Sequence, residues 1–352
     1  MHPDWQSFLE ARGAVFDDHD GEPGVAEFRT SGNVEGPELA DLSPLGLLRV
    51  EGPDAGRFLQ GYATADVTRL APDRALPSAL CTREGRTLAT FRMWGPAEAL
   101  SMRLHRALIV PVRDLLARYI VFSKADLVEP GDEVVGLGLM GEGAAEAAAR
   151  ICGSAPEDGA VITGTGEHGP ITAFRCRGET ERIELWLDVR DAPAVWDRLA
   201  EHCRPVPYSR WVSHRIRAGY VELSPRTAGE YIPQALNLQA LGSISFDKGC
   251  YLGQEVVARM QYLGKIKKRL YRFTLEASSC PDLGAPVNLE ETDGKEVGEV
   301  VAAAVDADHC ELMAVIRVSA AEKPLFVGGQ RLTPQALPYE IPESGTPASA
   351  TG

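Results

Sequence analysis

The stretch that decides the fold spans residues 231–270 and reads YIPQALNLQALGSISFDKGCYLGQEVVARMQYLGKIKKRL. Its centre places Cys250 between two glycines, directly before a helical pattern over residues 254–262. Glycines permit close approach of a ligand to the backbone, and a helix N-terminus next to Lys248 favours the thiolate over the thiol. The residues alone leave two interpretations of Cys250 open. It is a nucleophile or transient metal ligand, or a structural cysteine that packs as a small apolar side chain.

Length and charge narrow the class of protein. The chain has 352 residues, of which 44% are hydrophobic and 24% charged, which is typical of a globular protein with two or three domains. Fifty acidic residues against 36 Lys and Arg give a net charge of −14, so we expect no nucleic-acid partner and no membrane surface. The N-terminus lacks the basic-then-apolar order of a secretion signal, and no apolar run approaches the ~20 residues of a bilayer span. We therefore expect a cytoplasmic protein.

The cysteines and histidines predict neither a disulfide framework nor a metal centre. The seven cysteines are scattered and never form a C-x-x-C pair, which favours reduced thiols. The histidines show no H-x-x-x-H or H-E-x-x-H spacing, so we expect no stable metal site. The cysteines are Cys81, Cys152, Cys176, Cys203, Cys250, Cys280 and Cys310.

Hydrophobic patterns predict an α+β fold followed by a small antiparallel β-barrel. Strands and helices mix without strict βαβ alternation up to residue 203, whereas short alternating runs separated by Gly, Pro and Asp turns follow residue 265. We expect a first region at 1–266, a barrel at 267–342 and a disordered tail at 343–352. The predicted strands are 45–50, 79–81, 87–94, 134–140, 171–176, 183–189, 269–275, 286–289, 297–304 and 311–318, and the predicted helices are 55–62, 108–122, an alanine-rich segment ending at 151, and 192–203.

The segment K-G-C-Y-x-G-Q-E at residues 248–255 resembles the signature of the YgfZ family, which is related to the glycine-cleavage aminomethyltransferases. The preceding Ile232-Pro233-Gln234 and Asn237-Leu238 are similar to the same family's lead-in. A looser resemblance covers most of the chain, from residues 45–50 through 57–61 to 338–340. It implies a three-lobed folate-binding ring followed by a C-terminal β-barrel. It also implies tetrahydrofolate-linked support of iron–sulfur cluster assembly or repair, with iron–sulfur proteins or their assembly factors as partners.

The resemblance also implies site residues. Cys250 is the functional cysteine, with Lys248 beside it as a second catalytic candidate. Residues 178–184 resemble a segment whose glutamate contacts the pterin ring, which makes Glu184 the candidate; the alternative is a solvent-facing residue on an edge strand. Residues 214–219 resemble a segment whose arginine would meet the folate's glutamate carboxylate, which points to Arg215.

Two further folate contacts are expected from the signature itself, at Gln254 and Tyr251. A basic run follows the signature at Lys265, Lys267, Lys268 and Arg269. This run is either a solvated strand edge or an anion site for the folate's polyglutamate tail or for an acidic partner.

One departure from the aminomethyltransferases bears on the reaction. Those enzymes carry an aspartate just after a glycine-rich hairpin turn, whereas residues 85–90 of this chain read GRTLAT and contain no carboxylate. General acid–base help cannot come from Leu88 or Ala89. We therefore favour a folate-binding accessory protein. A folate-dependent aminomethyltransferase or demethylase acting on a small amine is the alternative, so whether the chain is an enzyme is left open.

A competing motif indicates a different cofactor. Gly136, Gly138 and Gly141 match the spacing of the dinucleotide-binding fingerprint, and Asp158 follows at a suitable distance. However, the first two glycines fall inside the predicted strand 134–140, and no parallel βαβ units follow. We therefore expect no nicotinamide cofactor.

Overall fold

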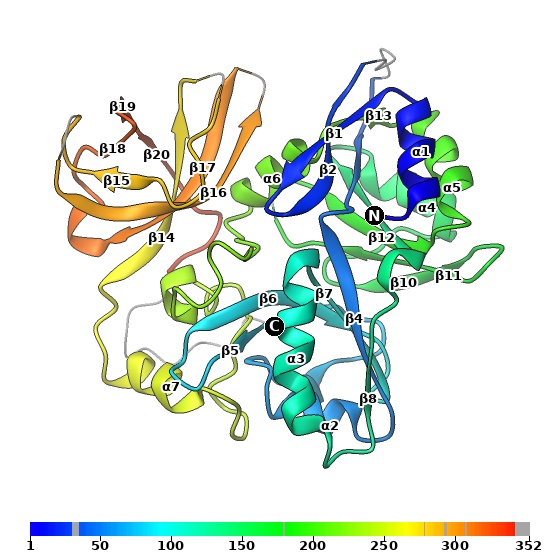
Figure 1. Cartoon of the computed structure of the whole chain (residues 1–352), viewed down its shortest axis with the longest axis horizontal. Helices are drawn as coiled ribbons and strands as arrows, with labels where there is room; N and C mark the ends of the chain where they lie inside the picture. Colours follow the sequence, from blue (N-terminus) through cyan, green and yellow to red (C-terminus); the bar gives the residue numbers. More distant parts are fainter. Residues whose placement is uncertain (30–34, 179, 278, 292–293, 307, 342–352) are drawn as a thin grey trace. The chain divides into compact units, whose positions relative to one another are not determined.

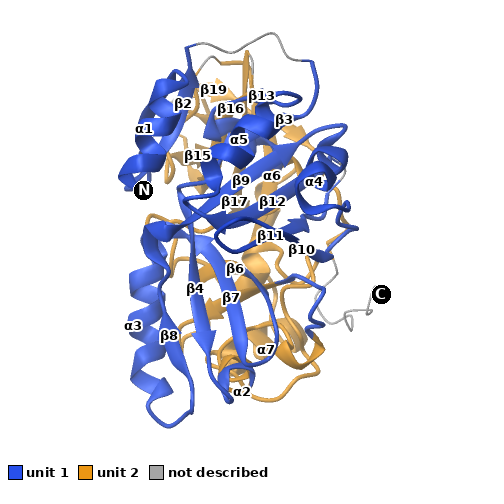
Figure 2. Ribbon diagram, turned by 90° about the vertical axis from the view of Figure 1, so that its right-hand side faces the viewer, with its two compact units in different colours: residues 1–56, 70–76, 92–214 blue, residues 57–69, 77–91, 215–352 orange. Residues whose placement is uncertain are grey.

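The computed structural model describes residues 1–29, 35–178, 180–277, 279–291, 294–306 and 308–341. The chain forms two compact units, which Figure 2 colours separately. Unit 1 contains residues 1–56, 70–76 and 92–214, and unit 2 contains residues 57–69, 77–91 and 215–352. Four elements cross from one unit to the other along the chain, namely α2 (Ala55–Gln60), β5 (Leu76–Cys81), β6 (Thr87–Trp94) and α6 (Tyr208–Arg217).

Unit 1 is built on a six-stranded sheet in the order β10-β11-β12-β9-β3-β13, antiparallel apart from the parallel pair β3 and β13. A second group of strands pairs β8 with β4, β4 with β7, and β7 with the end of β6. The helices of unit 1 are α1 (Pro3–Ala11), α3 (Ile109–Ile120), α4 (Ala144–Cys152) and α5 (Ala192–Ala200). Its strands are β1 (Ala14–His19), β2 (Glu22–Phe28), β3 (Glu38–Asp41), β4 (Leu45–Glu51), β7 (Ala99–His105), β8 (Asp126–Val128), β9 (Val134–Met140), β10 (Val161–Thr165), β11 (Pro170–Arg175), β12 (Arg182–Asp188) and β13 (Arg204–Pro205).

The core of unit 1 explains the glycines of the competing motif. Gly136 and Gly138 lie inside β9, in the middle of an antiparallel sheet. A side chain at Gly136 would meet the ring of Trp186 at 2.8 Å, and one at Gly138 would meet the ring of Trp211 at 2.7 Å. These glycines make room for two tryptophans on the sheet, which is a packing role and not the phosphate-binding turn of a dinucleotide fold.

Unit 2 contains α7 (Gln254–Tyr262) and an antiparallel β-barrel that is nearly closed (Figure 1). The barrel strands follow the order β19-β18-β15-β16-β17-β14-β20. They are β14 (Lys268–Leu275), β15 (Pro286–Asn288), β16 (Glu296–Asp306), β17 (His309–Arg317), β18 (Phe326–Val327), β19 (Gln330–Arg331) and β20 (Thr333–Gln335). Alternating side chains of β14, β16 and β17 fill the interior, including Phe273, Val300, Leu312 and Ile316.

The expected fold class is confirmed, both in the α+β character of the first region and in the C-terminal antiparallel barrel. The barrel begins at Lys268, next to the predicted start at residue 267. The predicted tail, 343–352, lies outside the described residues. Among the described residues, no helix combines the length and the apolar character that crossing a membrane requires.

Candidate functional site

The KGCYLGQE segment is a loop of unit 2 that leads into α7. The helix begins at Gln254, as its sequence pattern predicts, and Gly253 immediately before it has a φ of +84°. A side chain at Gly253 would collide with the carbonyl oxygen of Thr82. Leu252 is tied down by a hydrogen bond from its N–H to the carbonyl of Gly61, at 3.0 Å. Glycine is therefore needed at position 253 for both the backbone conformation and the close packing of this loop.

Lys248 is the anchor of the loop. Its ammonium group donates hydrogen bonds to the carbonyl oxygens of Gln60, Ala63 and Ala65, at 2.8, 2.7 and 2.8 Å. The side chain is buried, and this burial lowers the pKa of Lys248 to about 8. Because an ammonium has three N–H donors, all of them are used by the backbone. The geometry favours Lys248 as a positioning residue that holds the loop in place.

Cys250 differs from the other free cysteines of the chain. Its side chain is exposed, and the neighbouring Gly249 faces open space. By contrast, burial raises the pKa of the other free thiols, to about 12 for Cys81 and to about 11 for Cys152 and Cys203. The pKa of Cys176 is raised for the same reason. The loop thus presents one accessible thiol, while the other free thiols are held protonated by their surroundings.

Tyr251 and Gln254 both lie close to Lys248. The Tyr251 ring is buried, and the Lys248 Nζ lies 5.2 Å from its centroid. Its hydroxyl has no hydrogen-bond partner among the described residues, and burial raises the pKa of that hydroxyl. Gln254 Nε2 approaches the carbonyl of Lys248 at 3.5 Å. The structure thus brings together four of the six site residues expected from the sequence, namely Lys248, Cys250, Tyr251 and Gln254.

Glu184 lies in unit 1, at the centre of the six-stranded sheet. It is on β12, between β11 and β9, and is fully buried, so the alternative of a solvent-facing edge residue is wrong. Its Oε1 accepts a hydrogen bond from Arg103 at 2.7 Å and lies 3.6 Å from the thiol of Cys176. Its Oε2 accepts from Trp186 Nε1 at 3.0 Å. A carboxylate offers about four acceptor positions, so it can take a further donor beside these partners, and a contact to a pterin stays a prediction.

Arg215 lies in unit 2 at the end of α6. The residue is buried, and its Nη1 is 3.6 Å from Glu222 Oε2. Within the described part of the chain, the Nε and Nη1 atoms of Arg215 have no hydrogen-bond partner. A buried guanidinium with unused donors is costly to the protein, because those donors have given up their water. They suit a carboxylate from a ligand, as expected for the glutamate of folate.

The hairpin between β5 and β6 lies in unit 2 and shows what occupies the place of the missing aspartate. Thr87 is buried, and its N–H donates to the carbonyl of Tyr231 at 2.7 Å. Thr90 is also buried, and its hydroxyl donates to the carbonyl of Val221 at 3.1 Å while accepting from the N–H of Leu223. Both threonines therefore serve packing and backbone hydrogen bonding within this unit.

Comparison with known proteins places this chain in a family. No family model matches the chain. The chain is 33% identical over 312 residues to the "tRNA-modifying protein YgfZ" of Pectobacterium carotovorum, an alignment that covers 87% of this chain and 92% of the relative. It is 30% identical over 310 residues to the protein of the same name from Escherichia coli O157:H7, covering 87% and 94%. The chain belongs to the YgfZ family.

The fold comparison agrees with the YgfZ assignment. The crystal structure of the glycine cleavage system aminomethyltransferase T from Bartonella henselae superposes with a TM-score of 0.75. The superposition covers 94% of this chain and 96% of the other, at 17% sequence identity. A likeness at this identity establishes a shared fold, and the function must be argued from the site.

Two features of this YgfZ-family chain were missed by sequence reasoning. Cys280 and Cys310 form a disulfide, with their Cα atoms 5.4 Å apart, so the expectation of seven reduced thiols is wrong for this pair. The two cysteines are 30 residues apart in sequence, and that spacing carries no signal. The register of β14 against β17, which places Leu275 opposite Cys310, brings the segment after β14 to the second cysteine.

The second missed feature is an acidic cluster on the barrel. Donor atoms of Asp306, His309 and Glu311 lie within 4.8 Å of one another, which is compact enough for a metal ion. However, Arg217 pairs with both carboxylates, and Arg272 donates to Glu311 at 3.1 Å. Two guanidinium groups already balance the negative charge of these carboxylates, in the place that a metal ion would take. We therefore do not assign a metal centre to this cluster.

Proposed function

We propose that this chain binds a reduced folate and supports iron–sulfur enzymes through the exposed thiol of Cys250. The observation that carries the proposal is the contrast among the thiols. Cys250 is exposed on a loop fixed by three hydrogen bonds from Lys248, whereas the other free cysteines are buried or half-buried. An accessible thiol on a rigid loop suits transient contact with an iron–sulfur cluster or its iron on a partner protein.

The names of the relatives suggest which enzymes are served. The curated relatives are called tRNA-modifying proteins. As part of the proposal, we extend a role in tRNA modification to this chain, which would act on a partner enzyme in the cytoplasm. The missing carboxylate at residues 85–90 supports an accessory role over aminomethyl transfer, because Leu88 and Ala89 cannot exchange a proton.

The residues that would hold a folate fit its chemistry in each unit separately. In unit 2, the Nε and Nη1 donors of Arg215 make no hydrogen bond to a described residue, although Nη1 lies 3.6 Å from Glu222, and they suit the carboxylate of the glutamate moiety. In unit 1, Glu184 has the lone pairs to accept from the amino and ring N–H groups of a pterin, and its hydrogen bond from Arg103 holds the side chain in place. When bound, tetrahydrofolate can carry one-carbon units, and the residues described here bind and orient it.

A calorimetric titration with tetrahydrofolate tests the folate half of the proposal. We expect saturable binding by the natural chain and by Cys250→Ser. We expect the Kd to rise at least about tenfold in Arg215→Lys, which keeps the charge but loses the planar fork. Arg331→Lys, at an exposed arginine of β19, is the matched control and should bind as the natural chain does. Binding unchanged by Arg215→Lys, or no binding at all, would remove folate from the proposal.

Selective alkylation tests the thiol half. With one equivalent of iodoacetamide on the folded protein, we expect mass spectrometry to find the label on Cys250 before any other cysteine. The reason is that alkylation requires an accessible thiolate, and burial keeps the remaining free thiols protonated. Cys250→Ser should then react slowly. Preferential labelling of Cys152 or Cys203 would contradict the assignment.

A further inference from the structure

A large pocket of unit 2 is lined by none of the KGCYLGQE residues, although Val256 directly after them contributes to it. It has a volume of about 1190 Å³. It is formed by the hairpin turn before β6, the 3₁₀ helix Pro233–Leu236, α7 with the segment that follows it, and the barrel strands β14, β16 and β17. The volume exceeds the roughly 300–1,000 Å³ usual for small-ligand sites. The pocket has room for a ligand larger than a single small metabolite.

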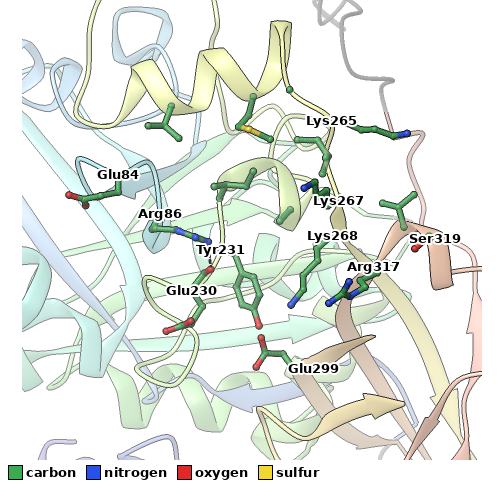
Figure 3. A pocket seen from close by; sticks show the side chains of 17 residues that line it. Glu84, Arg86, Glu230, Tyr231, Lys265, Lys267, Lys268, Glu299, Arg317 and Ser319 are labelled. Atoms are coloured by element: carbon green, nitrogen blue, oxygen red, sulfur yellow. Dashed lines mark hydrogen bonds between the residues drawn. The ribbon is translucent and has the colours of Figure 1, made fainter. Parts of the chain in front are cut away.

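Cations gather on one side of this pocket. In Figure 3, Lys267, Lys268 and Arg317 lie on that side, and Glu84 and Glu230 lie toward the other. Arg86 lies on the side of Glu84 and donates a hydrogen bond to the backbone carbonyl of Glu230 at 2.7 Å, which leaves the side-chain carboxylate of Glu230 as an acceptor. A concentration of cations is unexpected in a chain with a net charge of −14. Local charge decides what a pocket attracts, because the field of distant surface charges is screened within about 10 Å at physiological salt. The cationic side therefore attracts an anion even though the whole chain is acidic.

Two of these cations form a cross-strand pair. Lys268 on β14 is directly opposite Arg317 on β17 in the antiparallel ladder. The neighbouring backbone is fixed by a hydrogen bond from the N–H of Val318 to the carbonyl of Lys267, at 3.0 Å. Among the described residues, no carboxylate pairs with the side chains of these three cations. Like charges opposite each other across strands are destabilising, and an anion bound between them would relieve that repulsion.

The rest of the pocket offers an apolar floor and hydrogen-bond acceptors. Ile232, Val256 and Met260 line it with apolar surface. Tyr231 is buried, and both burial and its hydrogen bond to Glu299 raise the pKa of its hydroxyl, so Glu299 is occupied by this bond. The exposed carboxylates of Glu84 and Glu230, on the side away from Lys267, Lys268 and Arg317, can only accept hydrogen bonds, which suits amino groups.

We propose that this pocket binds nucleotides, with phosphate held by Lys267, Lys268 and Arg317 and an amino-bearing base directed to Glu84 and Glu230 over the apolar floor. The ligand comes either as a free nucleotide or as part of a single-stranded RNA. The proposal goes beyond the proposed function, since it requires neither folate nor Cys250. It also modifies the expectation, drawn from net charge, that the chain has no nucleic-acid partner.

Fluorescence anisotropy with labelled octaadenylate and octauridylate tests the proposal. We expect saturable binding, with octaadenylate favoured about tenfold because adenine carries an amino group and uracil does not. The double variant Lys267→Glu/Arg317→Glu should weaken octaadenylate binding by at least about tenfold. The slope of log K against log salt concentration should also become shallower, by about 0.7 for each phosphate that is no longer neutralised. Lys323→Glu/Arg331→Glu, at an exposed lysine and an exposed arginine outside the pocket, is the charge-matched control. Lys267→Gln/Arg317→Gln checks the effect without charge reversal.

The remaining measurements distinguish a free nucleotide from RNA as the ligand and include the results that would overturn the proposal. AMP binding with the same dependence on Lys267 and Arg317 would assign a free nucleotide, and binding of the octamer alone would assign RNA. Glu84→Ala/Glu230→Ala should abolish the preference for octaadenylate over octauridylate. Equal binding of poly-γ-glutamate, or octaadenylate binding unchanged by the double charge reversal, would overturn the proposal. Cys250→Ser should bind RNA normally, so failure of the proposed function would leave this test unaffected.

Discussion

At the scale of single residues, the role of Lys248 shows what sequence could and could not reveal. Its place beside Cys250 indicates a charge that acts on the thiol. In the structure, its ammonium group instead donates to three backbone carbonyls of residues 60–65, which lie more than 180 positions earlier in the chain. The sequence shows which residues neighbour Lys248 along the chain. It does not show a long-range interaction of this kind, which depends on the tertiary fold.

The anchoring role of Lys248 predicts a loss of stability. We expect Lys248→Met to lower the free energy of unfolding by roughly 2–4 kcal/mol, because three buried carbonyl oxygens lose a charged donor. Urea denaturation of the purified variant measures this. Lys323→Met, at an exposed lysine, should change stability by less than about 0.5 kcal/mol. A Lys248→Met protein as stable as the natural chain would show that the three hydrogen bonds do not hold the loop.

At the scale of elements, regular patterns were predicted well and irregular ones were missed. The alternation of apolar residues predicted β14, β16 and β17, and the helical pattern after Gly253 predicted α7. Helix α1 was missed, although Pro3 at its start and the four-residue spacing of Trp5 and Leu9 could have revealed it. The many short barrel strands, such as β18 and β19, are too short to show any period.

Strand β9 gives a prediction for the packing of its glycines. We expect Gly138→Ala to destabilise the protein by about 1–3 kcal/mol, because the new methyl group would lie 2.7 Å from the ring of Trp211 and 3.1 Å from Leu42. Gly169→Ala is a suitable control, since nothing lies within 4 Å of a side chain at that position. Chemical denaturation compares the two variants. Equal stability of both would mean that Trp211 does not pack on this strand.

Strand β3 carries a carboxylate that predicts pH dependence. Burial opposes the ionisation of Glu38, but hydrogen bonds from His214 and Arg210 outweigh it and lower the pKa of Glu38 to about 2. Arg204 adds an ion pair at 2.6 Å. A depressed folded-state pKa contributes stability above the ordinary value near 4.5, and this contribution is lost as the pH falls toward 2.

Glu38→Gln should therefore be less stable than the natural chain at pH 7, by roughly 3 kcal/mol. It should also lose less stability than the natural chain between pH 4.5 and 2. Unfolding free energies measured across that range check the difference, with Glu146→Gln on the exposed face of α4 as the control. Parallel acid profiles for Glu38→Gln and the natural chain would contradict the assignment.

At the scale of the whole molecule, the sequence motif predicted the family, and the structure shows where each part of the motif lies. The fold class followed from residues 231–270 and from the change in pattern after residue 265. The division into two units could not be predicted from the sequence, because the chain passes between the units several times and no composition shift marks those crossings. The Cys280–Cys310 pair and the pocket lined by Lys267, Lys268 and Arg317 also depend on the tertiary arrangement.

The most direct test of the central claim is complementation in bacterial cells that lack their own YgfZ-family protein, with the modified-nucleoside content of tRNA measured by mass spectrometry. We predict that the natural chain and Cys152→Ser restore the modified nucleosides, since Cys152 is a half-buried thiol outside the loop. Cys250→Ser should accumulate as a folded protein and leave the nucleoside content at the level of cells without the chain. Full restoration by Cys250→Ser would contradict the claim that this exposed thiol carries the function.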